Sequence, residues 1–468
     1  MVKKASEAKR PNLESVTTIN LDGSRFFLHP ADARGRFVIA RRFFAILLIA
    51  VYAALPWIQI NGQPAVFLDL FNRRFHLFGI TFAAQEIWLA FFFITGLAFL
   101  LFFTTALFGR LWCGWACPQT VFLEHVYRRV ERWIEGDAPE RRQLDGAPLS
   151  ANKVAKRVFK HGFFILISAA IAHLFLAYFV SIPQLYAWMT ASPLEQFGAF
   201  TFMAVSTGIL YFNFAWFREQ LCIVICPYGR LQSALIDEHT VNVAYDEQRG
   251  EPRGKLGTEG AGDCIDCNRC VHVCPTGIDI RQGLQLECVA CTACIDACDE
   301  IMDKVKRPRG LIRYASEESL GGRATRFIRA RTVLYGFFML VGIAVMLFSF
   351  SRVQPFEATV SRMTGQPYFV TEEVIRNQFQ IRLVNKRNES AAFRVFVEDP
   401  PPGMELAGWG EVMRLDPYEE RTRPLILVQP REDYTGRARL DILIESEDGR
   451  HSLRRRAEFV GPDPRVFQ

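Results

Sequence analysis

The chain has 468 residues, of which 50% are hydrophobic and 22% charged, and its formal net charge is +6. This length allows two or three domains. The basic residues flank apolar segments rather than forming one face of a soluble domain, which argues against nucleic-acid binding. No P-loop, glycine-rich nucleotide motif or hydrolase triad is present, so a pump or a hydrolytic enzyme has no support.

Five apolar segments are long enough to cross a bilayer, which takes roughly 20 helical residues. They are residues 43–60, 87–108, 163–182, 197–217 and 333–350. Buried helices of a large soluble protein are the alternative, but such helices rarely reach this length without a charge. No small-residue cleavage pattern follows the first segment, so it is not a removable signal peptide.

Lysine and arginine are concentrated in alternate connecting segments. Residues 1–42 hold nine, 109–162 hold ten and 218–332 hold sixteen, whereas 61–86 hold two and 183–196 hold none. Because basic segments remain in the cytoplasm, we expect the amino terminus and both long basic segments on the cytoplasmic side of a bacterial inner membrane. Five crossings then place the carboxy-terminal part in the periplasm.

This order predicts five parts. They are a basic amino-terminal segment (1–42), four membrane helices (43–230), a cytoplasmic segment (231–332), a fifth membrane helix (333–350) and an outer domain (351–468). The cytoplasmic segment has its core at residues 260–305.

Eight of the twelve cysteines lie in the cytoplasmic segment and repeat the spacing C-x2-C-x2-C-x3-C. Three thiolates two residues apart can hold one iron–sulfur cubane, while the fourth reaches the other cluster. The spacing therefore predicts a ferredoxin-like α+β module with two [4Fe–4S] clusters. On this cross-over logic, one cluster is held by Cys264, Cys267, Cys270 and Cys298, and the other by Cys288, Cys291, Cys294 and Cys274.

Disulfides and zinc are the alternatives for these eight cysteines. The predicted location is the reducing cytoplasm, which disfavours disulfides. Zinc sites use two pairs of ligands for each ion and do not require the doubled pattern. The second motif departs from the usual form, because Asp299 stands where Pro275 follows the first motif, but this change removes no ligand.

The other four cysteines form two pairs, in "FGRLWCGWACPQ" (Cys113 and Cys117) and "FREQLCIVICPY" (Cys222 and Cys226). Both follow F-x4-C-x3-C-P at the end of a predicted outward-to-inward span, which indicates an internal duplication offset by 109 residues. Positions i and i+4 share a helix face, so both sulfurs of a pair should point the same way. The proline after each pair should break or kink the helix there.

If the two halves pack together, the four thiols meet near the cytoplasmic boundary of the membrane. Soft ligands suit a thiophilic metal such as Cu(I), or a redox dithiol. Another cluster and plain burial as small hydrophobes are further alternatives. His173, inside the third span, is a separate functional candidate because ionisable residues at that depth are costly. A neutral histidine bonded within the bundle is the competing interpretation.

The segment after residue 350 alternates apolar and polar residues, as in "NQFQIRLVNK" and "RARLDILIESED". Turn-rich pieces such as "DPPPG" separate these runs. About seven short strands in this length predict an all-β immunoglobulin-like sandwich. It contains no cysteine and no catalytic constellation, so we interpret it as a docking domain.

The order of these parts resembles the CcoG/FixG (RdxA) family, accessory proteins of cbb3-type cytochrome c oxidase. The combination of "CGWACP", "CIVICPYGR", the eight-cysteine segment and the sandwich carries the resemblance. It implies a cupric reductase that converts Cu(II) to Cu(I) for insertion into the oxidase. Implied partners are a copper transporter or chaperone, oxidase subunits and an unidentified electron donor, with the copper ion as substrate. In this interpretation, Cys113, Cys117, Cys222 and Cys226 carry the copper chemistry.

Two other functions remain open. The membrane half also resembles the NapH-type polyferredoxins, which would make the protein a quinol-linked conduit to another periplasmic acceptor. A scaffold with redox-inert clusters, which gathers oxidase subunits through its outer domain, is the third possibility. The carboxy-terminal sandwich favours the first family over the second.

Overall fold

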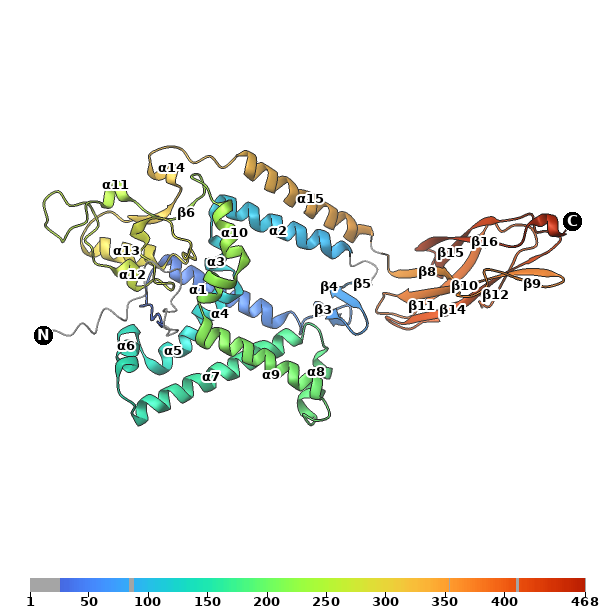
Figure 1. Ribbon diagram of the computed structural model, residues 1–468, viewed down its shortest axis with the longest axis horizontal. Helices are drawn as coiled ribbons and strands as arrows, with labels where there is room; N and C mark the ends of the chain where they lie inside the picture. The colour runs from blue at the N-terminus through green and yellow to red at the C-terminus, as the bar shows by residue number, and fades with distance from the viewer. Residues whose placement is uncertain (1–25, 84–87, 353, 410–411, 468) are drawn as a thin grey trace. The chain divides into compact units, whose positions relative to one another are not determined.

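The computed structural model describes residues 26–83, 88–352, 354–409 and 412–467. The chain forms two compact units. One comprises Met1–Ile58 with Trp88–Met346, and the other comprises Gln59–Ile87 with Leu347–Gln468. The first unit is mainly helical, and the second consists mainly of strands (Figure 1).

Five helices of the described residues are long and apolar enough to cross a membrane. They are α1 (Arg36–Ala54), α2 (Trp88–Phe108), α7 (Ala151–Leu176), α9 (Phe197–Phe212, continued by the π-helix η4, Asn213–Phe217) and α15 (Ala330–Arg352). The predicted second span began at residue 87, which lies outside the described residues.

The predicted bounds of the first span are wrong. Helix α1 begins at Arg36 because the Asp296 carboxylate accepts the backbone N–H groups of Phe37 and Val38, at 3.3 and 2.7 Å. This interaction supplies partners that the first turn of a helix otherwise lacks. The helix ends at Ala54 because Pro56 has no N–H to extend the hydrogen-bond ladder.

The predicted bounds of the third span are also wrong. Helix α7 starts at Ala151, where the Ser150 side chain caps it by accepting the N–H of Lys153 at 3.2 Å. Its first three turns carry Lys153, Lys156, Arg157 and Lys160 among apolar residues, and a search for uninterrupted apolar runs does not detect them. The helix ends at Leu176, and a separate helix, α8 (Ile182–Thr190), precedes α9.

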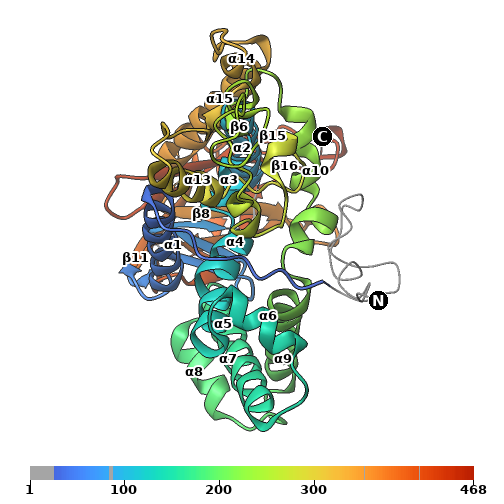
Figure 2. The same ribbon diagram turned by 90° about the vertical axis from the view of Figure 1, so that its left-hand side faces the viewer.

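Short helices follow the second and fourth spans. After α2 come α3 (Leu111–Trp115), α4 (Pro118–Phe122), the π-helix η3 (Leu123–Tyr127), α5 (Arg128–Glu135) and α6 (Ala138–Gly146). After η4 come the π-helix η5 (Leu221–Ile225) and α10 (Pro227–Leu235). Helices α5, α6, α7 and α9 lie together at one side of this unit (Figure 2).

The cysteine-rich segment is a small α+β module of the first unit. Strand β6 (Asn242–Tyr245) pairs antiparallel with β7 (Ile312–Ala315). Around this ribbon lie α11 (Glu247–Gly250), α12 (Arg269–His272), η6 (Ile280–Gln282), α13 (Ala293–Lys304) and α14 (Glu317–Leu320). Ile295, Met302 and Ile312 are fully buried among the cysteines, so this module has its own core.

The second unit contains a two-sheet sandwich, which agrees with the predicted fold. One sheet has the order β12-β14-β10-β8, with β9 paired to β10, and the other has the order β13-β11-β15-β16. The strands are β8 (Phe356–Arg362), β9 (Phe369–Val370), β10 (Val374–Asn385), β11 (Ala391–Glu398), β12 (Glu405–Ala407), β13 (Met413–Leu415), β14 (Glu420–Pro430), β15 (Ala438–Ser446) and β16 (Ser452–Phe459), and the 3-10 helix η7 (Pro464–Phe467) follows them. The alternating apolar side chains of both sheets form one buried core.

The loop between the first two spans contains strands that the sequence analysis did not predict. They are β1 (Gln59–Ile60), β2 (Gln63–Pro64), β3 (Val66–Asp69), β4 (Arg74–Leu77) and β5 (Ile80–Ala83), and the last three form one sheet. The Tyr418 hydroxyl donates to the carbonyl oxygen of Asn61 at 3.1 Å. The prediction that assigned this loop to the membrane half is therefore wrong, because it belongs to the compact unit of the sandwich.

Candidate functional site

The eight cysteines of the α+β module line two cavities. The first cavity is lined by Cys264, Cys267, Cys270 and Cys298, and the second by Cys274, Cys288, Cys291 and Cys294. Cys270 also reaches the second cavity. Each cavity thus receives three thiols of one motif and the fourth thiol of the other. This grouping is the one that the cross-over logic predicts, although the assignment of each cysteine as a ligand remains a prediction.

The chemistry of both cavities fits a [4Fe–4S] cluster. Apolar side chains such as Ile278 and Met302 complete the walls. Burial raises the pKa of Cys288 and of Cys298 to about 12, so these thiols would be neutral without a nearby positive charge. A bound cluster would supply that charge and favour the thiolates.

The two membrane cysteine pairs adopt the same local turn. The backbone at Cys117 is extended (φ −62°, ψ 124°), as it is at Cys226 (φ −62°, ψ 111°), and a new helix starts at the following proline. The N–H of Cys117 donates to the carbonyl of Trp112 at 2.9 Å, and that of Cys226 to the carbonyl of Leu221 at 2.8 Å, each five residues back. The predicted helix break is confirmed.

The expectation that the two cysteines of a pair share one helix face is wrong. Cys113 lies within α3, but Cys117 follows the end of that helix and caps α4. In the second pair, Cys222 lies within η5 and Cys226 caps α10. The proline after each second cysteine favours extended geometry at that cysteine, which separates the two thiols of a pair onto different elements.

The four thiols of the two repeats nevertheless lie near one another. The pKa of Cys222 is raised to about 12. Burial is the largest cause, and the neighbouring thiols of Cys117, Cys113 and Cys226 add to it. Burial likewise raises the pKa of Cys113 to about 11, and the Gln232 amide opposes this shift by donating to its sulfur at 3.3 Å. The thiols are therefore close enough to repel one another as thiolates, and a bound cation would relieve that repulsion.

The first repeat packs directly on the loop that carries the second cluster motif. A Cβ atom at Gly114 would lie 2.5 Å from the carbonyl oxygen of Ala290 and 2.7 Å from that of Val289. These two residues separate Cys288 from Cys291. Only glycine permits this approach, so the backbone between Cys113 and Cys117 touches the backbone between two predicted cluster ligands.

Arg110 fixes the same contact by hydrogen bonds to three backbone carbonyls. One guanidinium nitrogen donates to the carbonyls of Leu286 and Cys288, the latter at 3.2 Å. The other nitrogen donates to the carbonyl of Gly229 in the second repeat, at 3.0 Å. Arg110 thus joins both repeats to the α+β module, and its positive charge favours the thiolate forms of Cys113 and Cys288.

Two further side chains, one from α1 and one from α3, hydrogen-bond to the α+β module. Arg41 of α1 donates to the carbonyl of Cys291 at 2.5 Å. The indole N–H of Trp115 donates to the Tyr314 hydroxyl at 3.3 Å. Together with Arg110, they link the α+β module to α1 and α3 by contacts that the spacing of its cysteines did not suggest.

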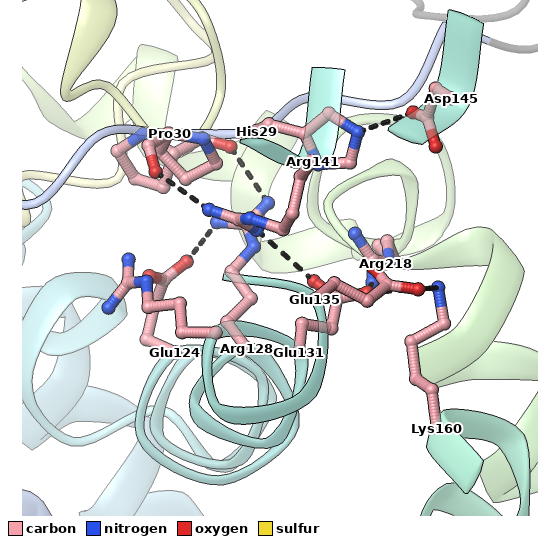
Figure 3. Close-up of polar contacts among 12 residues, drawn as sticks. His29, Pro30, Glu124, Arg128, Glu131, Glu135, Arg141, Asp145, Lys160 and Arg218 are labelled. Carbon is pink, nitrogen blue, oxygen red and sulfur yellow. Dashed lines mark hydrogen bonds and ion pairs between the residues drawn. The ribbon is translucent and has the colours of Figure 1, made fainter. Parts of the chain in front are cut away.

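A buried cluster of ion pairs follows the first repeat and joins it to the second (Figure 3). Arg128, after the first repeat, pairs with Glu124 and with Glu219 of the second repeat, the latter at 3.1 Å. It also donates to the carbonyl of Pro275, next to Cys274, at 3.1 Å. Complete burial makes the loss of any one of these partners costly.

Glu131 is the second centre of this cluster (Figure 3). Its carboxylate pairs with Arg218, and its oxygens lie 3.5 Å from a guanidinium nitrogen of Arg141 and 4.0 Å from Nζ of Lys160. Burial alone would raise the pKa of this carboxyl, but Arg218, Lys160 and Arg141 hold it at about 2. Glu131 is therefore ionised at neutral pH and ties the end of the fourth span to α5, α6 and α7.

Sequence reasoning missed Arg110, Gly114 and the ion-pair cluster. Gly114 had a local signal, because an isolated glycine in a helical segment often marks a close approach of backbones. Arg110 had none, because its partners lie more than a hundred residues away in the chain, and for Arg128 only the i,i+4 pair with Glu124 is local, whereas Glu219 lies ninety-one residues away. His173 lies apart from the cysteines, near the end of α7.

Comparison with known proteins supports an iron–sulfur protein. The model of a 4Fe-4S dicluster domain matches residues 217–317, and that of a 4Fe-4S binding domain matches residues 89–136. The model of the IG-like fold at the C-terminal of FixG matches residues 346–462. Apolar spans joined to ferredoxin domains define a membrane-bound iron–sulfur electron-transfer protein.

Two relatives narrow this class to one family. The chain is 39% identical to protein RdxA of Cereibacter sphaeroides over 79% of this chain and 82% of that protein. It is 36% identical to the nitrogen fixation protein FixG of Rhizobium meliloti over 81% of each chain. It belongs to the FixG/RdxA family. The crystal structure of a FixG-related protein from Vibrio parahaemolyticus matches 23% of this chain and 97% of that one, at 16% identity and a TM-score of 0.22.

Proposed function

We propose that the protein is a cupric reductase, which passes electrons from two [4Fe–4S] clusters to copper held at or near Cys113, Cys117, Cys222 and Cys226. The observation that carries this proposal is the backbone contact of Gly114 with Val289 and Ala290. It brings the first membrane motif against the loop that would hold the second cluster, which supports a direct electron path between them.

The electron count agrees with this role. A bound [4Fe–4S] cluster supplies one electron at a time, and the conversion of Cu(II) to Cu(I) consumes one. The four thiols are soft ligands that favour Cu(I) over Cu(II), so they also favour the product of the reduction. Gln232 orients the sulfur of Cys113 by a hydrogen bond, and Arg110 holds the motif against the cluster loop.

The proposal includes a place in the cell. The basic segments orient the α+β module toward the cytoplasm and the sandwich toward the periplasm of a bacterial inner membrane. Cu(I) would pass to a copper transporter or chaperone and support the assembly of a cbb3-type cytochrome c oxidase. The sandwich would dock these partners, and a separate protein or a quinol would donate the electrons.

The test is anaerobic reduction of Cu(II) by the dithionite-reduced protein, followed with a Cu(I)-specific chelator. A variant with all four membrane cysteines changed to Ser should lose at least nine-tenths of the rate while it keeps its iron content. A variant with Ser only at Cys267 should lose cluster iron and serves as the matched control. An unchanged rate in the four-cysteine variant would refute copper chemistry at these thiols and favour a quinol conduit or a scaffold.

A second candidate for the membrane thiols is a further iron–sulfur cluster. The match of a 4Fe-4S binding domain to residues 89–136 favours it, because that stretch contains only Cys113 and Cys117 among the cysteines. Two clusters in the α+β module require eight iron atoms per chain, whereas a third [4Fe–4S] cluster would require twelve. Iron and acid-labile sulfide analysis of the intact protein and of the four-cysteine variant distinguishes the two candidates.

A further inference from the structure

A separate cavity of about 430 Å³ lies between α7, α8 and α9. Each helix contributes one side chain with a soft donor atom to its wall, namely His173, Met189 and Met203. It lies at the beginning of α9, whereas Cys222 follows the end of that helical segment. Fourteen residues separate Met203 from Phe217, which is roughly 20 Å at helical rise. The cavity is therefore distinct from the cysteine site.

The hydrogen bonding of His173 leaves one ring nitrogen for a ligand. Its Nδ1 atom lies 2.7 Å from the carbonyl oxygen of Ala169. A carbonyl oxygen only accepts, so Nδ1 carries the proton and the neutral ring has its lone pair on Nε2. Histidines that bind metals usually donate their other N–H in this way, which fixes the tautomer and the orientation of the ring.

The rest of the cavity restricts the kind of ion that it can hold. No Asp, Glu, Lys or Arg is among the residues that line it, and most of the wall is apolar, including Leu185, Trp188 and Phe200. Hard divalent cations require carboxylate or carbonyl oxygen ligands, whereas thioethers select Cu(I). One imidazole and two thioethers are neutral ligands, so the full charge of a bound ion stays uncompensated. A monovalent ion therefore costs less to bury here than a divalent ion.

We propose that this cavity binds one Cu(I) ion through His173 Nε2 and the thioether sulfurs of Met189 and Met203. The inference deepens the proposed function and rests on it, because it gives the reduced ion a second holding site at the far end of the spans. A quinol fits less well as the occupant, since its electrons would have to cross roughly 20 Å of helix to reach the nearest membrane thiol.

The test uses the full chain with its clusters intact and with all four membrane cysteines changed to Ser, so that only the new site remains. Cu(I) is titrated under anaerobic conditions against a competing Cu(I) chelator, and iron content is measured in parallel. We expect one Cu(I) per chain, with nitrogen and sulfur neighbours in X-ray absorption. Met203→Leu, which conserves volume, and His173→Gln should each weaken binding at least tenfold. Met339→Leu on α15 should leave it unchanged.

Absence of Cu(I) from this protein, or binding that neither substitution weakens, would overturn the inference. Displacement of Cu(I) by a quinol analogue with no metal–sulfur signal would also overturn it and identify an organic ligand. The outcome is separable from the proposed function. Cupric reduction that depends on the four cysteines without a Cu(I) site at His173 would refute only this inference. A Cu(I) site at His173 with thiol-independent reduction would refute only the thiol mechanism.

Discussion

The two C-x3-C-P repeats share a backbone turn but make different contacts. In each repeat, the second cysteine is extended and its N–H bonds to the carbonyl five residues back. The position three residues before the first cysteine is Arg110 in one repeat and Glu219 in the other, so the charges are opposite. The residue after the first cysteine is Gly114 in the first repeat and Ile223 in the second. The duplication thus kept the turn that presents the thiols and diverged in what surrounds it.

This difference assigns separate roles to the repeats. The first repeat contacts the α+β module through Arg110 and Gly114, whereas Glu219 of the second repeat pairs with Arg128 in the buried ion cluster. Under the proposed function, electrons enter through the first repeat, and the second repeat completes the set of thiols. Substitutions at matched positions can break this asymmetry.

The largest effect should come from Arg128→Met, which removes the buried ion pairs that link the repeats. It leaves the buried carboxylates of Glu124 and Glu219 without this partner, at a cost of about 3–5 kcal/mol. We expect a clear fall in the thermal unfolding temperature of the protein in detergent. Arg142→Met, at an exposed position of α6, is the control and should change it little. Equal stability of the two variants would contradict a structural role for the ion cluster.

The next effect should come from Gly114→Ala, which places a methyl group against the carbonyls of Val289 and Ala290. The clash should cost about 1–3 kcal/mol and shift the cluster loop. We expect slower electron transfer to copper, with an altered EPR signal of one cluster. In contrast, Gly162→Ala on α7 has open space around it and should be neutral or stabilising by about 0.5–1 kcal/mol. Identical kinetics in both variants would remove Gly114 from the electron path.

The smallest effect should come from Arg110→Gln, which removes a positive charge near Cys288. The reduced cluster carries one more negative charge, so its potential should fall by tens of millivolts, about 1 kcal/mol at an effective dielectric of 20. EPR-monitored redox titration measures this shift. Arg110→Lys keeps the charge and should restore most of the potential. A potential unchanged in Arg110→Gln would show that the guanidinium acts only through its hydrogen bonds.

Local patterns predicted the parts of the molecule that depend on short stretches of chain. The spacing around Cys264 and Cys288 predicted two four-thiol groups, and the proline after Cys117 predicted the helix break. The alternation after residue 350 predicted the sandwich. These features are local because metal-binding spacing, proline geometry and strand periodicity act over a few residues.

The missed features depend on long-range contacts. Helix α1 starts at Arg36 because of Asp296, and the strands near Asn61 belong with Tyr418, more than two hundred residues away in each case. The lysine-rich beginning of α7 belongs to the helix, and Ser150 caps its first turn. Local hydropathy and periodicity carry no information about such distant partners, so the span bounds and the outer loop were predicted incorrectly.

The most direct test of the central claim is a single-turnover experiment on the intact protein. The clusters are reduced, excess dithionite is removed, and Cu(II) is added with a Cu(I)-specific chelator while cluster absorbance and Cu(I) are recorded together. The account predicts one Cu(I) for each electron lost by the clusters, with both signals slowed equally in the four-cysteine variant. Clusters that stay reduced while Cu(II) is present would contradict it.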